Sequence, residues 1–341
     1  WIPEYAGTQM TDWLQNMGDW NISRRRYWGL PLPFYPCKRC GHLTVIGSRT
    51  ELAERAVDSL DGLRELHRPW VDDVRIACEA CGTPSTRIDA VGDAWLDAGI
   101  VPFSTLRYLD QDAAWADWYP VDFITEMREQ IRLWFYSMLF MSVTLEGRAP
   151  YRAAFVFEKL NDEAGQPMHK SLGNAVNFND AADRMGADVM RWLYAGQNPL
   201  ANINFGYGPA GEVKRRMLTL WNLYAFFVTY ARLDGFDPSK PPVPLAERAD
   251  LDRWVLSRLQ SLVDVMTDAM DQFLVHRGVR ATQEFVEDVS NWYVRRGRRR
   301  YWKAEDDTDK RAAYQTLYEV LTTLVQLLAP VMPFWTEDIY Q

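Results

Sequence analysis

Beyond residue 206 the apolar positions of the chain recur with a period near 3.6, which is typical of amphipathic helices. The pattern predicts four long helices, over residues 212–233, 251–273, 278–302 and 310–328. A segment rich in proline and aspartate, residues 234–244, predicts a loop between the first two. Long helices with short connections favour an antiparallel helical bundle in this part of the chain.

The preceding part of the chain has a different pattern, in which short apolar runs alternate with a helical period. Residues 123–126 predict the end of a strand, residues 131–145 a buried helix, and residues 153–157 a second buried strand. Strand, helix and strand in this order are typical of a parallel α/β sheet. Asn177 is expected to cap the next helix. The sequence therefore predicts an α/β region followed by an all-α region.

The composition is that of an ordinary globular protein. Of 341 residues, 48% are hydrophobic and 25% are charged, which excludes wholesale disorder. A chain of this length favours two or three domains, and no apolar run approaches the ~18 residues of a membrane span. With 38 basic and 46 acidic side chains the net charge is −8. This charge disfavours a general nucleic-acid coat but is compatible with a local basic groove.

All four cysteines fall into two Cys-x-x-Cys pairs, Cys37 with Cys40 and Cys78 with Cys81, and a glycine follows each pair. The glycines allow the tight turns of a metal-binding knuckle, and four thiolates suit tetrahedral Zn²⁺ with Zn–S distances of about 2.3 Å. Buried free thiols and a redox pair are the alternatives. Four cysteines are too few for a disulfide framework and favour a reducing cytoplasm. We expect a structural zinc site in an inserted module.

A polar loop follows the second predicted strand and contains one of the seven lysines of the chain, Lys170. A lysine and backbone amides at the C-terminal edge of a parallel sheet form a phosphate-binding arrangement. The alternative is a solvated hairpin loop. The loop residues that carry this hypothesis are Gly165, Met168, His169, Lys170, Ser171, Gly173 and Asn174.

An arginine-rich segment lies at the end of the third predicted bundle helix. Five guanidinium groups occur within two helical turns, those of Arg295, Arg296, Arg298, Arg299 and Arg300. Phe285, Val289 and Trp292 are expected to form the buried stripe of this helix, so most of the arginines would project outward.

Aromatic residues interleave with these arginines, namely Tyr293, Tyr301 and Trp302. A basic patch with aromatic rings is of the kind that neutralises RNA phosphates and stacks bases. The alternative is intramolecular pairing with nearby acids, Glu284, Glu287, Asp288 and Glu305. Both arrangements can hold for different arginines.

Several of these segments resemble signatures of class I aminoacyl-tRNA synthetases. Residues 168–174, Met-His-Lys-Ser-Leu-Gly-Asn, resemble the KMSKS-Leu-Gly-Asn signature. Residues 19–33 resemble the "DW-ISR-RYWG-PIP" segment, and residues 93–99 resemble the "DVWFDSG" strand end. Residues 285–302 resemble the "LSNWYVRRSRRRFW" helix of isoleucyl-tRNA synthetases, and residues 328–334 resemble the "LAP–PF" bundle signature. These matches follow the family order across nearly the whole chain.

The resemblance implies the second half of a Rossmann-type catalytic domain with an inserted zinc knuckle, followed by an α-helical anticodon-binding bundle. The expected parts are re-entry into the catalytic domain (1–36), the zinc-knuckle insertion (37–90), the catalytic half with the KMSKS-like loop (91–178), a connective segment (179–210) and the anticodon-binding domain (211–341). The implied activity is ATP-dependent activation of isoleucine, with Mg²⁺, and its transfer to tRNA(Ile) in the cytoplasm. The expected partners are isoleucine, ATP and tRNA, with no membrane, and the full-length enzyme is expected to be monomeric.

The resemblance also implies individual roles. Lys170 would meet the negative charge that develops on the phosphates, assisted by the Ser171 hydroxyl, because positioning and charge stabilisation dominate this reaction. Glu126 would accept a hydrogen bond from the aminoacyl-adenylate, and Gln130 and Trp134 would line the same cleft. A solvated helix-start acid and a core tryptophan are the alternatives for Glu126 and Trp134. The further loop residues implied at the nucleotide are Met168, His169, Gly173 and Asn174.

Two departures from the family pattern indicate a divergent subfamily. Pro167 and His169 replace the first lysine and the serine of the KMSKS signature, which leaves Lys170 as its remaining lysine. The family's "EG-DQ-RGWF" segment appears at residues 126–135 without its two glycines and its aspartate. The alternatives are a valyl or leucyl enzyme, or a non-catalytic tRNA-binding paralogue.

The ends of the chain predict an internal segment of a longer protein, because it begins at Trp1 without Met and stops at Gln341 in a helical pattern. The family's His-x-Gly-His element needs two histidines three positions apart. The four histidines lack that spacing; they are His42, His67, His169 and His276. We expect this chain on its own to lack activation and editing activity.

Overall fold

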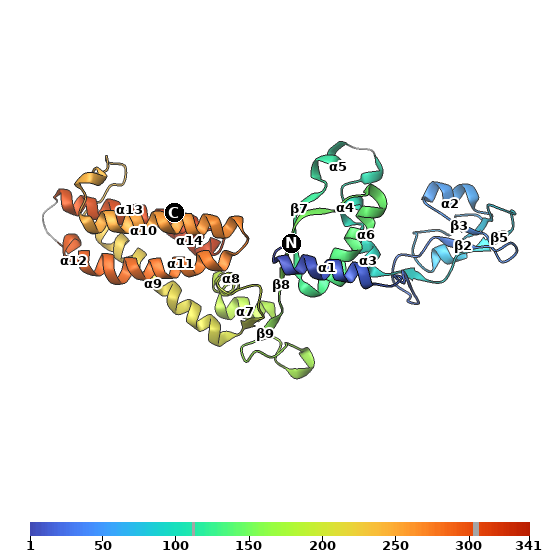
Figure 1. Cartoon of the computed structure of the whole chain (residues 1–341), viewed down its shortest axis with the longest axis horizontal. Helices are drawn as coiled ribbons and strands as arrows, with labels where there is room; N and C mark the ends of the chain where they lie inside the picture. Colours follow the sequence, from blue (N-terminus) through green and yellow to red (C-terminus); the bar gives the residue numbers. More distant parts are fainter. Residues whose placement is uncertain (111–112, 303–306) are drawn as a thin grey trace. The chain divides into compact units, whose positions relative to one another are not determined.

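The computed structural model describes residues 1–110, 113–302 and 307–341 and divides into two compact units (Figure 1). The first unit comprises Trp1–Phe155 and the second comprises Val156–Gln341. Over the described residues, no helix combines the length and the apolar character that crossing a membrane requires.

The first unit joins a helical region to a small β-rich module. Its helices are α1 (Glu4–Asn16), α2 (Arg49–Arg55), α3 (Ala94–Gly99), α4 (Val101–Ser104), α5 (Ala113–Trp118) and α6 (Trp134–Glu146). Its strands are β1 (Ser23–Arg24), β2 (Phe34–Pro36), β3 (Leu43–Val45), β4 (Arg75–Ala77), β5 (Pro84–Thr86), β6 (Val91–Gly92), β7 (Val121–Met127) and β8 (Tyr151–Phe157). β1 pairs antiparallel with β6, β2 with β3 and β4 with β5, while β7 and β8 form a further two-stranded sheet.

The module between β1 and β6 carries all four cysteines. The β1–β6 pairing closes its base, and buried Asp93 reinforces this closure. The Asp93 carboxylate accepts a hydrogen bond from the Trp20 indole at 3.1 Å and pairs with Arg24, so two segments with family-like motifs meet here. The apolar core of the module is small and consists of Tyr35, Ile46, Leu52, Leu63, Val71, Val74 and Ile76.

The predicted order of strand, helix and strand is confirmed by β7, α6 and β8. A short 3₁₀ helix, Arg128–Arg132, separates β7 from α6, so α6 begins at Trp134 and not at residue 131. Helix α3 packs on α6 so closely that a Cβ atom at Gly99 would lie 2.7 Å from the Ser137 carbonyl oxygen. A glycine at this position is what permits the close packing.

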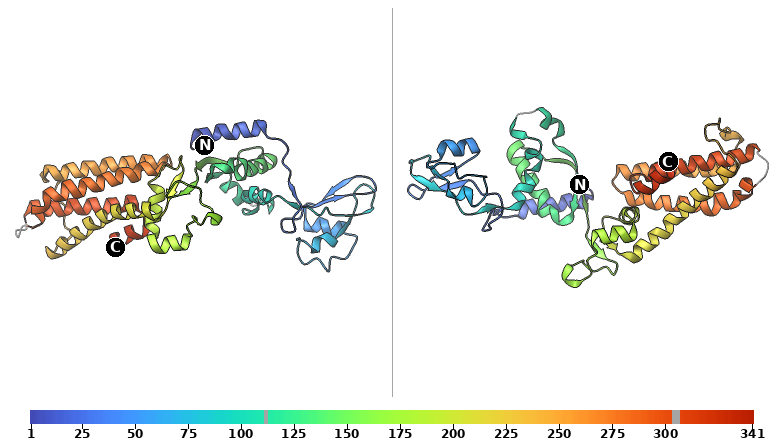
Figure 2. Two further views of the ribbon diagram at one scale, coloured as in Figure 1. Left: turned by 90° about the horizontal axis from the view of Figure 1, so that it is seen from below. Right: turned by 180° about the vertical axis from the view of Figure 1, so that it is seen from behind.

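The second unit is dominated by helices that run side by side (Figures 1 and 2). They are α7 (Phe178–Met185), α8 (Ala187–Ala195), α9 (Tyr207–Leu233), α10 (Asp250–Asp271), α11 (Val275–Glu287), α12 (Arg295–Trp302), α13 (Thr308–Leu328) and α14 (Pro333–Tyr340). Two short strands, β9 (Leu160–Asp162) and β10 (Ile203–Phe205), pair in parallel. The predicted helical bundle is confirmed, and the Asn177 side chain caps α7 by accepting a hydrogen bond from the Asn179 amide at 2.9 Å.

The third predicted bundle helix is interrupted by a π-helix. Residues Asp288–Val294 form this π-helix between α11 and α12. Phe285 and Val289 are buried as predicted, but the Trp292 residue is 48% exposed and Tyr293, 1% exposed, takes the core position. The predicted burial of Trp292 is wrong, because the wider turn of a π-helix advances the core-facing position by one residue relative to a 3.6 period.

Candidate functional site

The four cysteines predicted to bind zinc lie together. Their Sγ atoms all lie within 4.8 Å of one another. The distance from Cys37 Sγ to Cys81 Sγ is 3.6 Å, and the distance from Cys40 Sγ to Cys78 Sγ is also 3.6 Å. A tetrahedral ion with Zn–S bonds of about 2.3 Å requires sulfur–sulfur separations of about 3.8 Å. The geometry therefore fits a four-thiolate zinc site.

Each cysteine pair lies in a tight backbone knuckle. The Gly41 amide donates to the Cys37 carbonyl oxygen at 2.9 Å, and the Gly82 amide donates to the Cys78 carbonyl oxygen at 2.8 Å. The two glycines have φ angles of +74° and +70°, which lie in the left-handed region that favours glycine. The glycines after the pairs therefore have the role expected from the sequence.

The thiols influence one another's ionisation. Backbone hydrogen bonding at Cys40 and Arg39 lowers the pKa of the Cys37 thiol to about 6. The pKa of Cys40 is raised to about 12, because the neighbouring thiols, foremost that of Cys81, outweigh the lowering by the His42 backbone. One thiolate disfavours a second nearby, and a divalent cation among them would relieve this repulsion. The donor chemistry thus also fits a metal such as Zn²⁺.

In the second unit, one aspartate and one asparagine hold the KMSKS-like loop. Asp162, at the end of β9, accepts from the Gln166 amide at 2.8 Å and from Asn174 Nδ2 at 2.8 Å. Asn174 also donates to the Pro167 carbonyl oxygen at 3.0 Å and accepts from the His169 amide at 2.9 Å. The hydrogen bond from Asn174, followed by the backbone amides, lowers the pKa of Asp162. Asp162 was not predicted from the sequence, because it is the last residue of a short strand that follows the predicted one.

The catalytic candidates of this loop face outward. Lys170 begins a single 3₁₀ turn that ends before Gly173, which has a φ of +67°. Lys170, Ser171 and His169 are exposed, while Met168 packs against the bundle core. Lys170 and Ser171 are therefore accessible to a ligand. The amide group of Asn174 is already engaged within the loop, so Asn174 positions the loop and does not offer a free contact.

The remaining residues that are expected to line the aminoacyl-adenylate site lie in the first unit. Glu126, at the end of β7, accepts from the Met127 amide at 2.9 Å. Gln130 accepts from the Trp134 amide at 3.1 Å at the start of α6, and Trp134 Nε1 donates to the Ala98 carbonyl oxygen at 2.9 Å. Trp134 and Gln130 thus stabilise the start of α6 and its contact with α3. Their common cleft with residues 168–174 stays a prediction, because that loop belongs to the other unit.

Among the five arginines, Arg300 is engaged within the bundle. Its two terminal nitrogens bind the two carboxylate oxygens of Asp252 at 2.7 and 2.6 Å, and a further ion pair joins it to Asp309 at 2.9 Å. Asp252 is fully buried and also accepts from the Tyr293 hydroxyl at 2.7 Å. The predicted alternative of intramolecular pairing therefore applies to Arg300.

The other four arginines, Arg295, Arg296, Arg298 and Arg299, are exposed. The Arg296 guanidinium lies 4.3 Å from the centroid of the Trp292 ring, and that of Arg298 lies 5.1 Å from the Trp302 ring. Of the acids proposed as partners, Asp288 pairs with Arg258, and Glu305 lies outside the described residues. The aromatic expectation is corrected for two residues, since Tyr293 and Tyr301 are buried and cannot stack on RNA bases.

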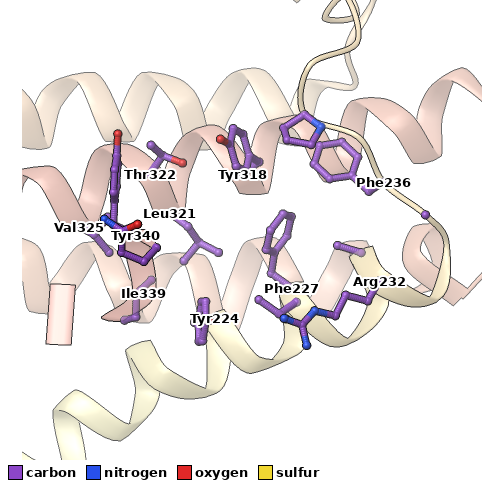
Figure 3. Close-up of a pocket in the computed structure, with 15 residues that line it drawn as sticks. Tyr224, Phe227, Arg232, Phe236, Tyr318, Leu321, Thr322, Val325, Ile339 and Tyr340 are labelled. Atoms are coloured by element: carbon purple, nitrogen blue, oxygen red, sulfur yellow. The ribbon is translucent and has the colours of Figure 1, made fainter. Parts of the chain in front are cut away.

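A pocket with a volume of about 610 Å³ lies within the bundle between α9, α13 and α14 (Figure 3). Its walls combine aliphatic side chains with aromatic rings from Tyr224, Phe227, Phe236, Tyr318 and Tyr340. Among the described residues that line it, Arg232 has the only charged side chain. None of the described side chains that line it is a carboxylate or an imidazole, so the lining offers no pair for acid–base chemistry.

Two family comparisons match different parts of the chain. Residues 1–206 match the tRNA synthetases class I (I, L, M and V), and residues 252–341 match the anticodon-binding domain of tRNA ligases. The isoleucine–tRNA ligases of Methanothrix thermoacetophila and Thermus thermophilus are each 42% identical to this chain over its whole length. The matches cover 32% and 33% of those proteins. The chain thus spans about a third of the length of the curated relatives it matches.

Solved structures share the fold. LeuRS of Agrobacterium radiobacter K84, in a ternary complex with tRNA and LeuAMS, has a TM-score of 0.69 at 19% identity, covering 98% of this chain and 44% of that chain. Methionyl-tRNA synthetase of Mycobacterium tuberculosis, with methionyl-adenylate, has a TM-score of 0.69 at 18% identity, covering 99% and 57%. Together with the two family matches, these shared folds confirm the expected combination of a class I catalytic fold and a helical anticodon-binding region.

Proposed function

The chain belongs to the class I tRNA synthetases of the isoleucine, leucine, methionine and valine group, and we propose that it serves the ATP-dependent activation of isoleucine and its transfer to tRNA(Ile). The observation that carries this proposal is the identity of 40–42% with isoleucine–tRNA ligases along the entire chain. Because the chain spans about a third of those relatives, the proposed activity is that of the complete gene product.

The loop of residues 168–174 would serve the activation step. In this step the carboxylate of isoleucine attacks the α-phosphorus of ATP and pyrophosphate leaves. Lys170 and Ser171 would stabilise the negative charge that develops on the phosphates, and Asn174 with Asp162 would hold the loop in place. Mg²⁺ bound with ATP would neutralise further phosphate charge.

The residues after β7 would serve the bound intermediate. Glu126 would accept a hydrogen bond from the aminoacyl-adenylate, and its place at the strand end supports this role. Gln130 would act by fixing the start of α6, and Trp134 by holding α6 against α3. Met168, His169 and Gly173 would shape the loop around the nucleotide.

The remaining sites would serve stability and tRNA binding. Zn²⁺ held by Cys37, Cys40, Cys78 and Cys81 would cross-link the module, with a structural and not a catalytic role. The exposed guanidinium groups would neutralise tRNA phosphates. We assign that role to Arg295, Arg296, Arg298 and Arg299, and assign Arg300 to the bundle interior.

The test is isoleucine-dependent exchange of pyrophosphate into ATP by the product of the complete gene. Lys170→Ala is expected to lower kcat by about 10²- to 10³-fold, the usual effect of removing one charge-stabilising donor. The isoleucine KM should change little, because the charge develops only in the transition state. Lys240→Ala, which removes an exposed lysine from the 234–244 loop, should leave exchange unchanged. A Lys170→Ala effect confined to KM would contradict the assignment.

The two alternatives are resolved by the same assay. Replacing isoleucine with valine or leucine in the assay tests whether the complete enzyme is instead a valyl- or leucyl-tRNA synthetase. A non-catalytic tRNA-binding protein is motivated by Pro167 and His169, which depart from the signature. If exchange is absent with all three amino acids while tRNA binding is intact, the protein is a non-catalytic tRNA-binding protein and the proposed activity is wrong.

A further inference from the structure

We propose that Trp292 and Arg296 form a stacking platform for an unpaired base of the bound tRNA, and that Arg295 and Arg299 hold the adjacent phosphates. The inference rests on the proposed function in so far as the partner is a tRNA. It adds the chemical group that is recognised, an unpaired nucleotide, and the residues that recognise it.

The ring of Trp292 is presented to solvent by the π-helix. In a regular helix residue 292 would continue the stripe of Phe285 and Val289, but in the π-helix Asp288–Val294 this place passes to Tyr293. No aromatic ring of the described residues packs on Trp292, and its ring contact is the Arg296 guanidinium at 4.3 Å. Trp302, by comparison, also lies against the ring of Tyr230. π-Helices occur frequently at functional sites.

Three exposed guanidinium groups share a helix face with this ring. Arg295, Arg296 and Arg299 lie in α12, where intervals of three and four residues place Arg299 beside the other two. The contact between the Arg296 guanidinium and the Trp292 ring adds the ring to this face. Within the described parts of the chain none of these three arginines forms an ion pair. The chain as a whole carries a net charge of −8, whereas this face is positively charged. Its charge therefore complements a polyanion such as RNA.

The orientation of this face is fixed from the core side. Tyr293 donates to Asp252, and Arg300 binds the same buried carboxylate through two hydrogen bonds. Together these contacts anchor both the π-helix and α12 to α10. The Trp292 and Arg296 side chains therefore project from a rigid helix, which reduces the entropy lost on binding.

An unpaired nucleotide matches this combination better than a duplex does. Unpaired RNA bases stack on aromatic side chains and on arginine planes, whereas bases inside a duplex are already stacked. Flanking arginines supply the phosphate contacts on either side of such a base. The ring and the guanidinium already form a stack that one base can extend.

The experiment measures binding of the 341-residue chain to a tRNA(Ile) transcript between about 50 and about 200 mM salt. Trp292→Leu is expected to weaken binding by about 5- to 100-fold at every salt concentration, which corresponds to one lost base stack. The slope of log K against log[salt] should not change, because no charge is removed. Trp292→Phe retains an aromatic face and should recover most of the affinity.

Two matched variants separate stacking from other effects. Arg299→Gln should instead lower the salt slope by about one unit. Trp221→Leu removes a similarly exposed tryptophan, 40% exposed on α9, and should bind as the unsubstituted chain does. Thermal unfolding of each variant reports whether the bundle is intact.

Each contrary outcome has a distinct meaning. Unchanged affinity in Trp292→Leu, with a lower slope in Arg299→Gln, overturns the stacking role and leaves tRNA binding standing. Equal losses in the Leu and Phe variants with lower thermal stability also overturn it, since the ring would then be structural. If the unsubstituted chain shows no salt-dependent tRNA binding, both this inference and the tRNA-binding part of the proposed function fail.

Discussion

Asn174 shows how one side chain can determine what its neighbours are free to do. Its amide nitrogen donates to Asp162 and to the Pro167 carbonyl oxygen, and its amide oxygen accepts from the His169 backbone. These bonds close the loop on itself and leave Lys170 outside the network. An exposed lysine on an otherwise fixed loop is suited to charge stabilisation, because little reorganisation is needed when the phosphates arrive.

His276 provides a residue-scale prediction about pH. It is 9% exposed in α11, and its Nδ1 has no hydrogen-bond partner among the described residues. Burial, together with the charges of Arg280 and Arg277, lowers its pKa below the usual histidine value of about 6.5. The fold therefore favours neutral His276, and its contribution to stability is complete above about pH 6.5 and declines as the pH falls.

The measurement compares thermal unfolding midpoints of the chain and of His276→Gln between about pH 7 and about pH 5. The unsubstituted chain should lose more stability over this interval, since only its side chain must accept a proton on unfolding. Parallel curves for the two proteins would show that His276 does not contribute to the pH dependence.

At the same scale, sequence spacing predicted some site residues and missed others for physical reasons. The four cysteines were predictable because metal geometry imposes short, recognisable spacings. Asp162 was missed because its partner Asn174 lies twelve positions away and the hydrogen bond exists only once the loop has closed. Arg300 could not be told apart from its neighbours, because its pairing with Asp252 joins two helices that the sequence does not relate.

At the scale of elements, the amphipathic period located the bundle helices because a regular helix buries one fixed stripe. The 3.6-residue period does not locate the buried positions where a helix departs from regular α-helical geometry. Core-facing positions run through residues 285, 289, 293, 297 and 301, a spacing of four that an α-helix does not sustain. The regular four-residue interval from Phe285 to Tyr301 was the available signal for the π-helix.

The buried ion pair between α10 and α12 predicts an element-scale cost. Asp252→Ala would leave the partly buried Arg300 with only Asp309 and would leave the Tyr293 hydroxyl with only its longer hydrogen bond to the Ala313 carbonyl oxygen, at 3.4 Å. Removing one partner of a buried pair destabilises by about 3–5 kcal/mol. Urea unfolding followed by circular dichroism should show a loss in this range.

Asp250→Ala provides the control for this prediction. Asp250 lies two residues earlier, at the first position of the same helix, is almost fully exposed and pairs with Arg253 on the surface. Its removal should cost less than about 1 kcal/mol. Similar small losses in both variants would mean that the Asp252–Arg300 pair does not support the bundle.

At the scale of the whole molecule, the two units differ in how they are held together. The second unit contains one extended apolar core shared by long helices, from Met185 on α7 to Val331 beside α14. The module of the first unit has a small core and strands of two or three residues. The parallel pair of β9 with β10 was not predicted, because its strands lie far apart in the sequence and pairing partners cannot be read from local pattern.

The contrast between the units predicts that metal removal will act on only one of them. Small modules with little apolar core depend on a bound metal for stability, and here the two cysteine pairs join segments that are otherwise held by short hairpins. Elemental analysis should find about one zinc per chain, and Cys78→Ser should lose it. Chelation should then expose residues 37–81 to proteases, while the thermal transition of the helical bundle stays unchanged.

His42→Ala is the matched control, since His42 lies beside the cluster but is not among its four ligands, and it should retain both zinc and protease resistance. A zinc-free chain whose 37–81 segment resists proteolysis as well as the zinc-bound form would overturn the structural role of the metal, because the module would then be stable through its own hairpins and core.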